Sequence, residues 1–135
     1  MVGVSIIVPT FRRTESLRRT LASCLRQEGV DAATVEIVVV DNCPQGSAGE
    51  TVSVVANGAA MPIRYVHETR AGVSHARNAG VRNARAPLLV FLDDDEEALD
   101  GWLAGLLAAQ ARFGADMVFG PVSYTHLTLP TNREV

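Results

Sequence analysis

The sequence contains no lysine, only two cysteines and no long uninterrupted apolar segment. No apolar run approaches the ~20 residues that cross a bilayer, so no membrane span is predicted within the chain. Cys24 and Cys43 show neither CxxC nor metal-ligand spacing, which indicates no cysteine-based metal site and favours a reducing compartment. The lack of lysine argues against a phosphoacceptor signalling domain, because such domains use a lysine near the phosphorylated aspartate.

Composition and charge are those of an ordinary globular domain. The 135 residues are 47% hydrophobic and 20% charged, which suits a single domain with a buried core and argues against disorder. The 12 basic residues are all arginine and are scattered, and the net charge is −3. No basic surface that could follow a phosphate backbone is predicted, so nucleic acid is not an expected partner.

Apolar runs alternate with amphipathic helical patterns along the chain. Strands are predicted at residues 4–8, 35–40, 63–66, 88–92 and 116–120, and helices at residues 14–27, 50–56, 73–84 and 100–112. Thr14 is the expected N-cap of the first helix, and the strand at 63–66 is expected near an edge. The order predicts an α/β fold with a mainly parallel, doubly wound sheet.

The helix predicted at residues 73–84 carries small residues along one stripe. Val73, Ala76, Gly80 and Ala84 recur at helical spacing, and small side chains there would let the helix approach the sheet closely. Cys24 continues the apolar stripe of the first helix and is expected to be a core thiol. Cys43 lies in a predicted loop, where no activating group is expected near it.

Five consecutive carboxylates, Asp93 to Glu97, directly follow the apolar run at residues 88–92. Like charges at a strand end raise one another's pKa, and a divalent cation such as Mg²⁺ or Mn²⁺ relieves that cost. In open α/β sheets ligands bind outside the carboxyl ends of the strands, where this run is predicted to lie. The alternative is a solvated acidic loop that opens the next helix.

The turn after the first strand, residues 9–13, contains no glycine. A dinucleotide-binding oxidoreductase needs glycines there so that the backbone can approach the pyrophosphate, so that class is rejected. A phosphatase-like arrangement with an aspartate nucleophile and Asp95 as the acid stays open, although its motif usually follows the first strand.

The last residues differ in composition from the rest of the chain. Residues 122–135 are rich in threonine and lack the alanine, glycine and arginine bias of the preceding sequence. The first six of them, residues 122–127, can be encoded by a transposon end used in preparing sequencing libraries. The expected organisation is therefore one domain at 1–121 and a non-native or disordered tail at 122–135.

Four segments stand in series along the chain: Ser5–Arg13, Glu36–Asn42, Ala71–Gly80 and Phe91–Glu96. In this order and spacing they resemble the nucleotide-binding half of a family 2 glycosyltransferase with the Rossmann-like GT-A fold. The resemblance covers residues 4 to about 121 and implies that residues 1–121 are a nucleotide-sugar-binding region, with a fold that is incomplete at the C-terminus. It implies transfer of a sugar from a nucleotide-diphosphate donor to an acceptor hydroxyl, with inversion and with help from Mn²⁺ or Mg²⁺.

The same resemblance implies roles for individual residues. Asp95 and Asp93 would ligate the metal, and Asp93 and Asp94 would contact the ribose or complete the metal site. The remaining donor-binding residues that the family pattern indicates are Pro9, Thr10, Asp41 and Arg77. Pro9 and Asp41 have plainer readings as a strand end and a turn residue, and Arg77 as a surface charge.

Two departures from the family pattern bear on activity. Arg70 stands where many members carry asparagine, and no residue matches the catalytic base, which is expected beyond Pro121. This chain alone is therefore expected to transfer sugar poorly or not at all, and the alternative is a non-catalytic nucleotide- and metal-binding fragment. The expected acceptor is a glycan or a lipid-linked glycan, and the expected location is the cytoplasm or the inner face of the cell membrane.

Overall fold

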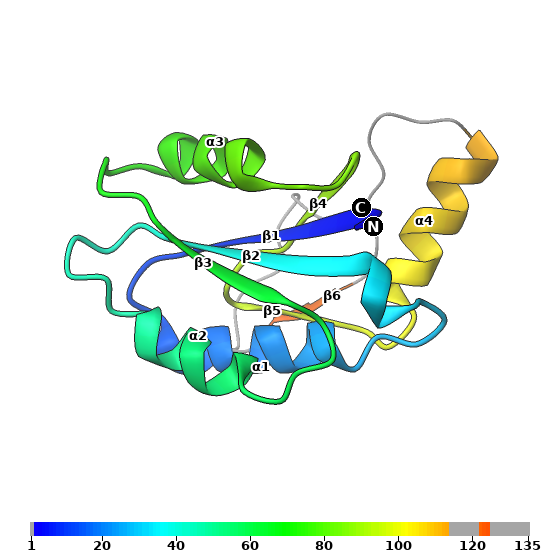
Figure 1. The fold of residues 1–135 in the computed structure, drawn as a ribbon, viewed down its shortest axis with the longest axis horizontal. Coiled ribbons are helices and arrows are strands. Elements are labelled where there is room, and N and C mark those ends of the chain that lie inside the picture. Colours follow the sequence, from blue (N-terminus) through cyan, green and yellow to red (C-terminus); the bar gives the residue numbers. More distant parts are fainter. Residues whose placement is uncertain (1, 114–121, 125–135) are drawn as a thin grey trace.

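The computed structural model describes residues 2–113 and 122–124 of the chain. Helices and strands follow one another in regular alternation up to the fourth strand (Figure 1). The elements are β1 (Val4–Thr10), α1 (Thr14–Leu25), the 3-10 helix η1 (Ala32–Thr34), β2 (Val35–Asp41), α2 (Gly49–Ala56), β3 (Ile63–His67), α3 (Val73–Asn83), β4 (Leu88–Phe91), β5 (Glu96–Ala98), α4 (Trp102–Phe113) and β6 (Val122–Tyr124). None of the helices in these residues is long and apolar enough to cross a membrane.

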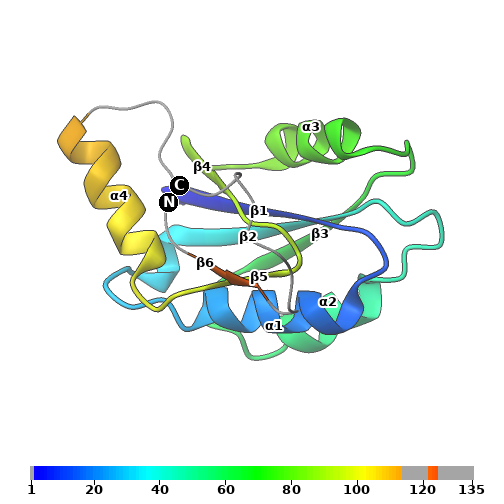
Figure 2. The same cartoon turned by 180° about the vertical axis from the view of Figure 1, so that it is seen from behind.

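Four strands form a parallel sheet in the order β3-β2-β1-β4. Helices α1 and α2 cover one face of this sheet and α3 covers the other, as the two opposite views show (Figures 1 and 2). The parallel register, the layers and the position of β3 at an edge confirm the doubly wound arrangement predicted from the sequence. All four carboxyl ends consequently point the same way.

The core lies on both faces of the sheet because side chains of β1 alternate between them. Ile6 and Val8 are fully buried on the side of α1, whereas Ile7 is fully buried on the side of α3. Cys24 is also fully buried on the α1 side, which confirms it as a core thiol. Burial raises the pKa of Cys24 to about 12.

Helix α3 approaches the sheet closely through a glycine. A Cβ atom added at Gly80 would lie 2.4 Å from Cγ2 of Ile7, far inside contact distance. Ala76 and Ala79 are buried beside it, whereas Val73 is 59% exposed. The predicted close approach is confirmed at Ala76 and Gly80. The prediction that Val73 also faces the sheet is wrong, because the helix begins at Val73 and that side chain points into solvent.

The acidic run is not the solvated loop opening the next helix that one sequence reading proposed. Glu96–Ala98 forms β5 and pairs antiparallel with β6, while the next helix begins only at Trp102. Two buried hydroxyls of α1 hold β5: Thr20 Oγ1 donates to the Glu96 carbonyl at 2.7 Å, and Ser23 Oγ accepts from the Ala98 N–H at 2.9 Å. Such long-range hydrogen bonds leave no periodic signal in a three-residue strand.

Smaller differences concern element ends. Arg13, not Thr14, is the N-cap of α1, and α1 ends at Leu25 rather than at residue 27. The strand predicted at 116–120 lies outside the described residues. Part of the predicted tail, Val122–Tyr124, forms β6, whereas residues 125–135 lie outside the described residues, so the nature of the tail stays a prediction.

Candidate functional site

The carboxyl ends of the strands bring together residues that are far apart in the sequence. In the register of the sheet, Thr10 at the end of β1 lies opposite Asp41 at the end of β2, and Asp41 lies opposite His67 at the end of β3. The segment after β4 joins the same edge, because Leu92 donates its N–H to the Ile7 carbonyl. The predicted gathering of Thr10, Asp41 and the acidic run at one edge is confirmed.

Asp94 is held by the end of β1. The Thr10 hydroxyl donates to Asp94 Oδ2 at 2.8 Å, and the Phe11 N–H donates to the same oxygen at 3.2 Å. Asp94 is only 8% exposed, and this burial raises its pKa above the ordinary value. The hydrogen bonds from Thr10 and Phe11 and the charge of Arg13 offset part of that rise in the pKa.

Arg13 faces two neighbouring carboxylates. Its Nη1 lies 3.0 Å from Asp95 Oδ2 and 3.8 Å from Asp94 Oδ1. The Arg13 side chain is 51% exposed, whereas Asp94 and Asp95 are buried. Sequence reasoning missed this residue, although two arginines directly after a strand end were a usable signal.

A short turn shapes the acidic run. The Glu96 N–H donates to the Asp93 carbonyl at 3.1 Å, and Glu96 Oε1 accepts from the Asp93 N–H at 2.9 Å. This reciprocal pair closes the turn that carries Asp94 and Asp95. Glu96 therefore supports the turn through its side chain.

The carboxylate oxygens of the acidic turn suit a hard divalent cation, but they do not form a complete coordination shell by themselves. Among the residues that the structure describes, no three His, Cys, Asp or Glu side chains group closely enough to hold a metal ion by themselves. Mg²⁺ is commonly bound by one or two carboxylates together with substrate phosphates. Asp93, Asp94 and Asp95 therefore fit a cation that a phosphate ligand also coordinates.

Asp41 is buried and already accepts several internal hydrogen bonds. Its Oδ1 accepts from the Cys43 N–H at 3.0 Å, and its Oδ2 accepts from the Ala48 N–H at 2.8 Å and from the Tyr65 hydroxyl at 2.7 Å. These bonds fix the loop between β2 and α2. Pro9, also predicted at the site, lies half-buried in β1 opposite Val40.

Asn42 ties the loop before α3 to the same edge. Its Nδ2 donates to the carbonyls of Glu68 and Arg70, each at 2.8 Å, and its Oδ1 accepts from the Gly72 N–H at 3.0 Å. Sequence reasoning did not include Asn42 among the site residues. Gly72 adopts a φ of +120°, so this tie depends on a backbone conformation that favours glycine.

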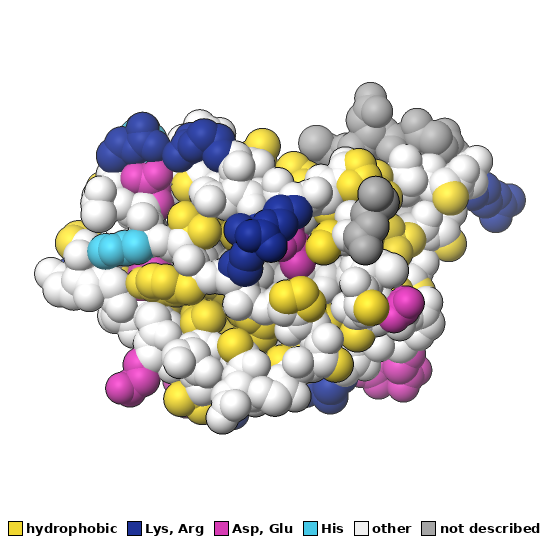
Figure 3. Space-filling view, in the orientation of Figure 1, with side chains coloured by type: hydrophobic (Ala, Val, Ile, Leu, Met, Phe, Trp, Pro, Cys, Tyr) yellow, Lys and Arg dark blue, Asp and Glu magenta, His cyan; other side chains and the backbone are white. Residues whose placement is uncertain are grey.

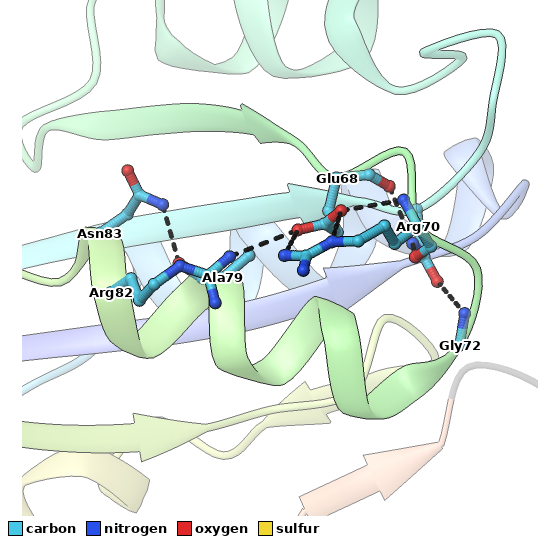
Figure 4. A network of polar contacts seen from close by, with 7 residues as sticks. Glu68, Arg70, Gly72, Ala79, Arg82 and Asn83 are labelled. Carbon is cyan, nitrogen blue, oxygen red and sulfur yellow. Dashed lines mark hydrogen bonds and ion pairs between the residues drawn. The ribbon is translucent and has the colours of Figure 1, made fainter.

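Glu68 organises the arginines around this loop (Figure 4). It accepts from Arg70 Nε and Nη2, each at 3.0 Å, and from Arg82 Nη2 at 3.4 Å. The hydrogen bonds from Arg70 lower the pKa of Glu68 to about 2. Basic side chains beside an acidic one are visible over α3 on the face shown in Figure 3. Arg70, the predicted departure from the family pattern, is thus turned onto Glu68.

Cys43 lies beneath Arg12 in the loop after β2. Arg12 Nε lies 3.5 Å from Cys43 Sγ, and Arg12 Nη2 donates to Gln45 at 3.1 Å. Hydrogen bonds from Ser47 and Arg12 lower the pKa of Cys43 to about 6, so the expectation that nothing activates this thiol is wrong. Arg12 has a φ of +54°, an uncommon conformation for a residue other than glycine.

Arg77 is not brought into this group. It is exposed on α3, and no hydrogen bond or ion pair joins it to the other residues that the structure describes. The buried side of α3 carries Ala76, Ala79 and Gly80 instead. The role of Arg77 in holding phosphate therefore stays a prediction.

Comparison with known proteins gives one family. The protein-family model described as Glycosyl transferase family 2 matches residues 5–132 of this chain. The chain is 36% identical over 119 residues to the succinoglycan biosynthesis protein ExoM of Rhizobium meliloti (strain 1021), covering 88% of this chain and 38% of that protein. The chain thus spans well under half of the length of this relative.

Solved structures agree on the fold. S. aureus TarS 1–349 superposes with a TM-score of 0.75 at 22% identity, covering 85% of this chain and 34% of that one. The mannosyltransferase PcManGT of Pyrobaculum calidifontis, solved with GDP-Man and Mn²⁺, gives 0.69 at 27% identity, covering 84% and 32%. These likenesses confirm the predicted GT-A fold.

Proposed function

The chain belongs to glycosyl transferase family 2, and we propose that it supplies the donor-binding part of an enzyme that transfers a sugar from a nucleotide diphosphate to an acceptor hydroxyl. The observation that carries this proposal is the grouping of Thr10, Asp94 and Asp95 at the carboxyl edge of the sheet. A polar edge of this kind is where open α/β sheets bind their ligands.

The acidic turn would hold the cation and the ribose. A bound Mn²⁺ or Mg²⁺ would neutralise the charge that grows on the diphosphate leaving group. We assign Asp95 and Asp93 as its ligands, with Asp94 fixed by Thr10 beside the ribose or completing the metal site. The support is the oxygen donor set and the Mn²⁺ in the PcManGT structure.

The nucleoside would lie against the ends of β1 and β2. Pro9 and Thr10 would line its pocket with backbone and hydroxyl groups. Because Asp41 already accepts from Cys43, Ala48 and Tyr65, we propose that it acts mainly by fixing the loop after β2. The contact of Arg77 with phosphate rests on the family resemblance alone.

The acceptor side is proposed from the family and not from this chain. We propose inversion at the anomeric carbon, a glycan or lipid-linked acceptor, and a location in the cytoplasm or at the inner face of the cell membrane. No catalytic base is assigned. Succinoglycan biosynthesis in the named relative supports polysaccharide assembly as the setting.

A second candidate is a nucleotide- and metal-binding module without transfer. It is favoured by the same group of residues, because carboxylates that fit a cation and a nucleotide support binding without by themselves supplying transfer. Binding without release of the sugar would indicate the module.

Calorimetric titration of the chain with UDP and GDP, with and without Mn²⁺, tests the proposal. We expect one of the two nucleotides to bind in Mn²⁺ and to lose most of its affinity in a chelator. If neither UDP nor GDP binds, the donor-binding role is wrong. A parallel assay for free nucleoside diphosphate released from UDP-glucose and GDP-mannose separates the enzyme from the module.

A further inference from the structure

Two neighbouring buried carboxylates face the same half-exposed arginine. Asp94 and Asp95 are 8% and 9% exposed, and Arg13 Nη1 lies within 4 Å of both. Burying two adjacent negative charges is costly unless a cation compensates them. Arg13 therefore acts as a counter-ion of both carboxylates.

The backbone of Arg13 is held in place, whereas its guanidinium can move. Its backbone carbonyl accepts from the Leu17 N–H at 2.8 Å at the start of α1, which anchors the main chain. Its side chain is 51% exposed, so the guanidinium can move without disturbing the core. A guanidinium binds phosphate as readily as carboxylate, because its planar fork matches both groups.

The preceding arginine is committed elsewhere. Arg12 contacts Cys43 and Gln45, and its Cζ lies 5.0 Å from the centroid of the Phe11 ring. Among the described residues, the ion pairs of Arg13 join it to Asp94 and Asp95. The two adjacent arginines thus have different partners, and Arg13 is the one that faces the acidic turn.

We propose that Arg13 is an exchangeable counter-ion, which neutralises Asp94 and Asp95 in the ligand-free protein and moves onto the diphosphate when nucleotide and cation bind together. This inference rests on the proposed function and deepens it. A cation that binds alone must displace Arg13 from its partners. When a nucleotide arrives with the cation, Arg13 gains a new anionic partner, so the two ligands bind with positive coupling.

The test measures binding and not turnover. Mn²⁺ alone, UDP or GDP alone, and nucleotide in saturating Mn²⁺ are titrated by calorimetry into wild type, Arg13→Gln, Arg13→Lys and Arg19→Gln. Arg19 is the matched control, because it lies on the same helix but pairs with Glu15. Thermal unfolding of each variant checks that it is folded.

Arg13→Gln is expected to bind Mn²⁺ alone roughly fivefold more tightly, because Mn²⁺ no longer has to displace a guanidinium from a partly exposed ion pair. It should also bind nucleotide in Mn²⁺ more weakly, so that the enhancement of nucleotide affinity by Mn²⁺ shrinks. Arg13→Lys keeps the charge and should retain most of that enhancement. Arg19→Gln should change each affinity by less than about twofold.

The outcomes separate the inference from the proposed function. If wild type binds nucleotide in Mn²⁺ but Arg13→Gln leaves both the Mn²⁺ affinity and the enhancement unchanged, the exchange is wrong and the proposed function stands. If wild type binds neither nucleotide nor Mn²⁺, the proposed function fails and the inference fails with it. If Arg13→Gln does not fold, Arg13→Lys decides alone: loss of the enhancement although the positive charge is kept would contradict a charge-based exchange.

Discussion

The two ends of the parallel sheet both bury carboxylates, but they compensate them differently. At the amino end, Glu36 is 1% exposed and accepts from Ser5 Oγ at 2.6 Å, from Arg64 Nε at 3.0 Å and from the Arg85 N–H at 2.8 Å. Arg64 also donates to the Asn83 carbonyl, and its side chain is 24% exposed. The charge of Glu36 is thus stabilised by donors from within the protein.

At the carboxyl end, two carboxylates share one guanidinium that is half in solvent. The Arg13 side chain is 51% exposed, about twice as much as that of Arg64. Asp94 has a raised pKa because burial exceeds its compensation, whereas hydrogen bonds from Arg64, Ser5 and Arg85 outweigh burial and lower the pKa of Glu36. Burial therefore outweighs the stabilisation of the charged form at Asp94 and is outweighed at Glu36, so a bound cation would gain more at the carboxyl end than at the amino end.

The largest expected effect breaks the amino end. Glu36→Ala would leave Arg64 without its buried partner and should lower the free energy of unfolding by about 3–5 kcal/mol. Urea denaturation followed by circular dichroism measures this loss. The exposed Glu28 provides the control, since Glu28→Ala should change stability by less than about 0.5 kcal/mol. A loss below about 1 kcal/mol for Glu36→Ala would show that its pairing is not needed for folding.

The next effect breaks the carboxyl end without unfolding the protein. Asp95→Asn should weaken nucleotide binding in Mn²⁺ at least about tenfold, or ~1.4 kcal/mol, because the cation would lose its main anchor. Its stability should stay within about 1 kcal/mol of wild type, because removing one of two adjacent charges relieves repulsion. Calorimetry decides the first point, with Asp100→Asn as the exposed control. Unchanged affinity would remove Asp95 from the site.

The contribution of Glu68 to stability should depend on pH. Because the hydrogen bonds from Arg70 lower its pKa to about 2 from an ordinary 4.5, the stability that it contributes is present above pH 4.5 and is lost as the pH falls towards 2. The difference in stability between wild type and Glu68→Gln should shrink over that range.

Salt should reduce the same difference, since both arginine partners of Glu68 are more than half exposed. The contribution of Glu36 should resist salt, because that carboxylate is buried. Equal salt sensitivity of the two contributions would contradict the distinction between the two ends.

The smallest effect is spectroscopic and compares the two thiols. Ultraviolet absorbance of the thiolate should show one transition near pH 6, from Cys43, because hydrogen bonds from Ser47 and Arg12 lower its pKa. Cys24 should not titrate below about pH 12, since burial raises its pKa. Arg12→Gln should move the transition upward, and Cys43→Ser should abolish it. A transition that survives Cys43→Ser would refute the assignment.

Local patterns were enough to predict the parallel sheet and the carboxylates at its edge. Strand periodicity places Thr10, Asp41 and Asp93 at strand ends, and parallel order makes those ends meet. The small residues Ala76 and Gly80 likewise predicted the close approach of α3. These features depend on neighbours in the sequence, so the sequence alone reveals them.

Features that depend on long-range side-chain contacts were not predictable in this way. The strand β5 depends on Thr20 and Ser23, more than 70 residues away along the chain. The occupation of Asp41 depends on Ala48 and Tyr65, and the pairing of Arg13 with Asp95 crosses the sheet edge. Such pairings are set by the three-dimensional fold, and even the two arginines after β1 do not show in the sequence which carboxylates they face.

Hydrogen–deuterium exchange with and without nucleotide and Mn²⁺ tests the difference between the two ends most directly. We expect slower exchange in peptides covering residues 10–14, 41–48 and 92–97 on addition of UDP or GDP with Mn²⁺. Peptides covering the amino ends of β1 and β2 should exchange at an unchanged rate. Protection confined to the amino end, or binding that protects neither end, would contradict the assignment of the carboxyl edge as the ligand site.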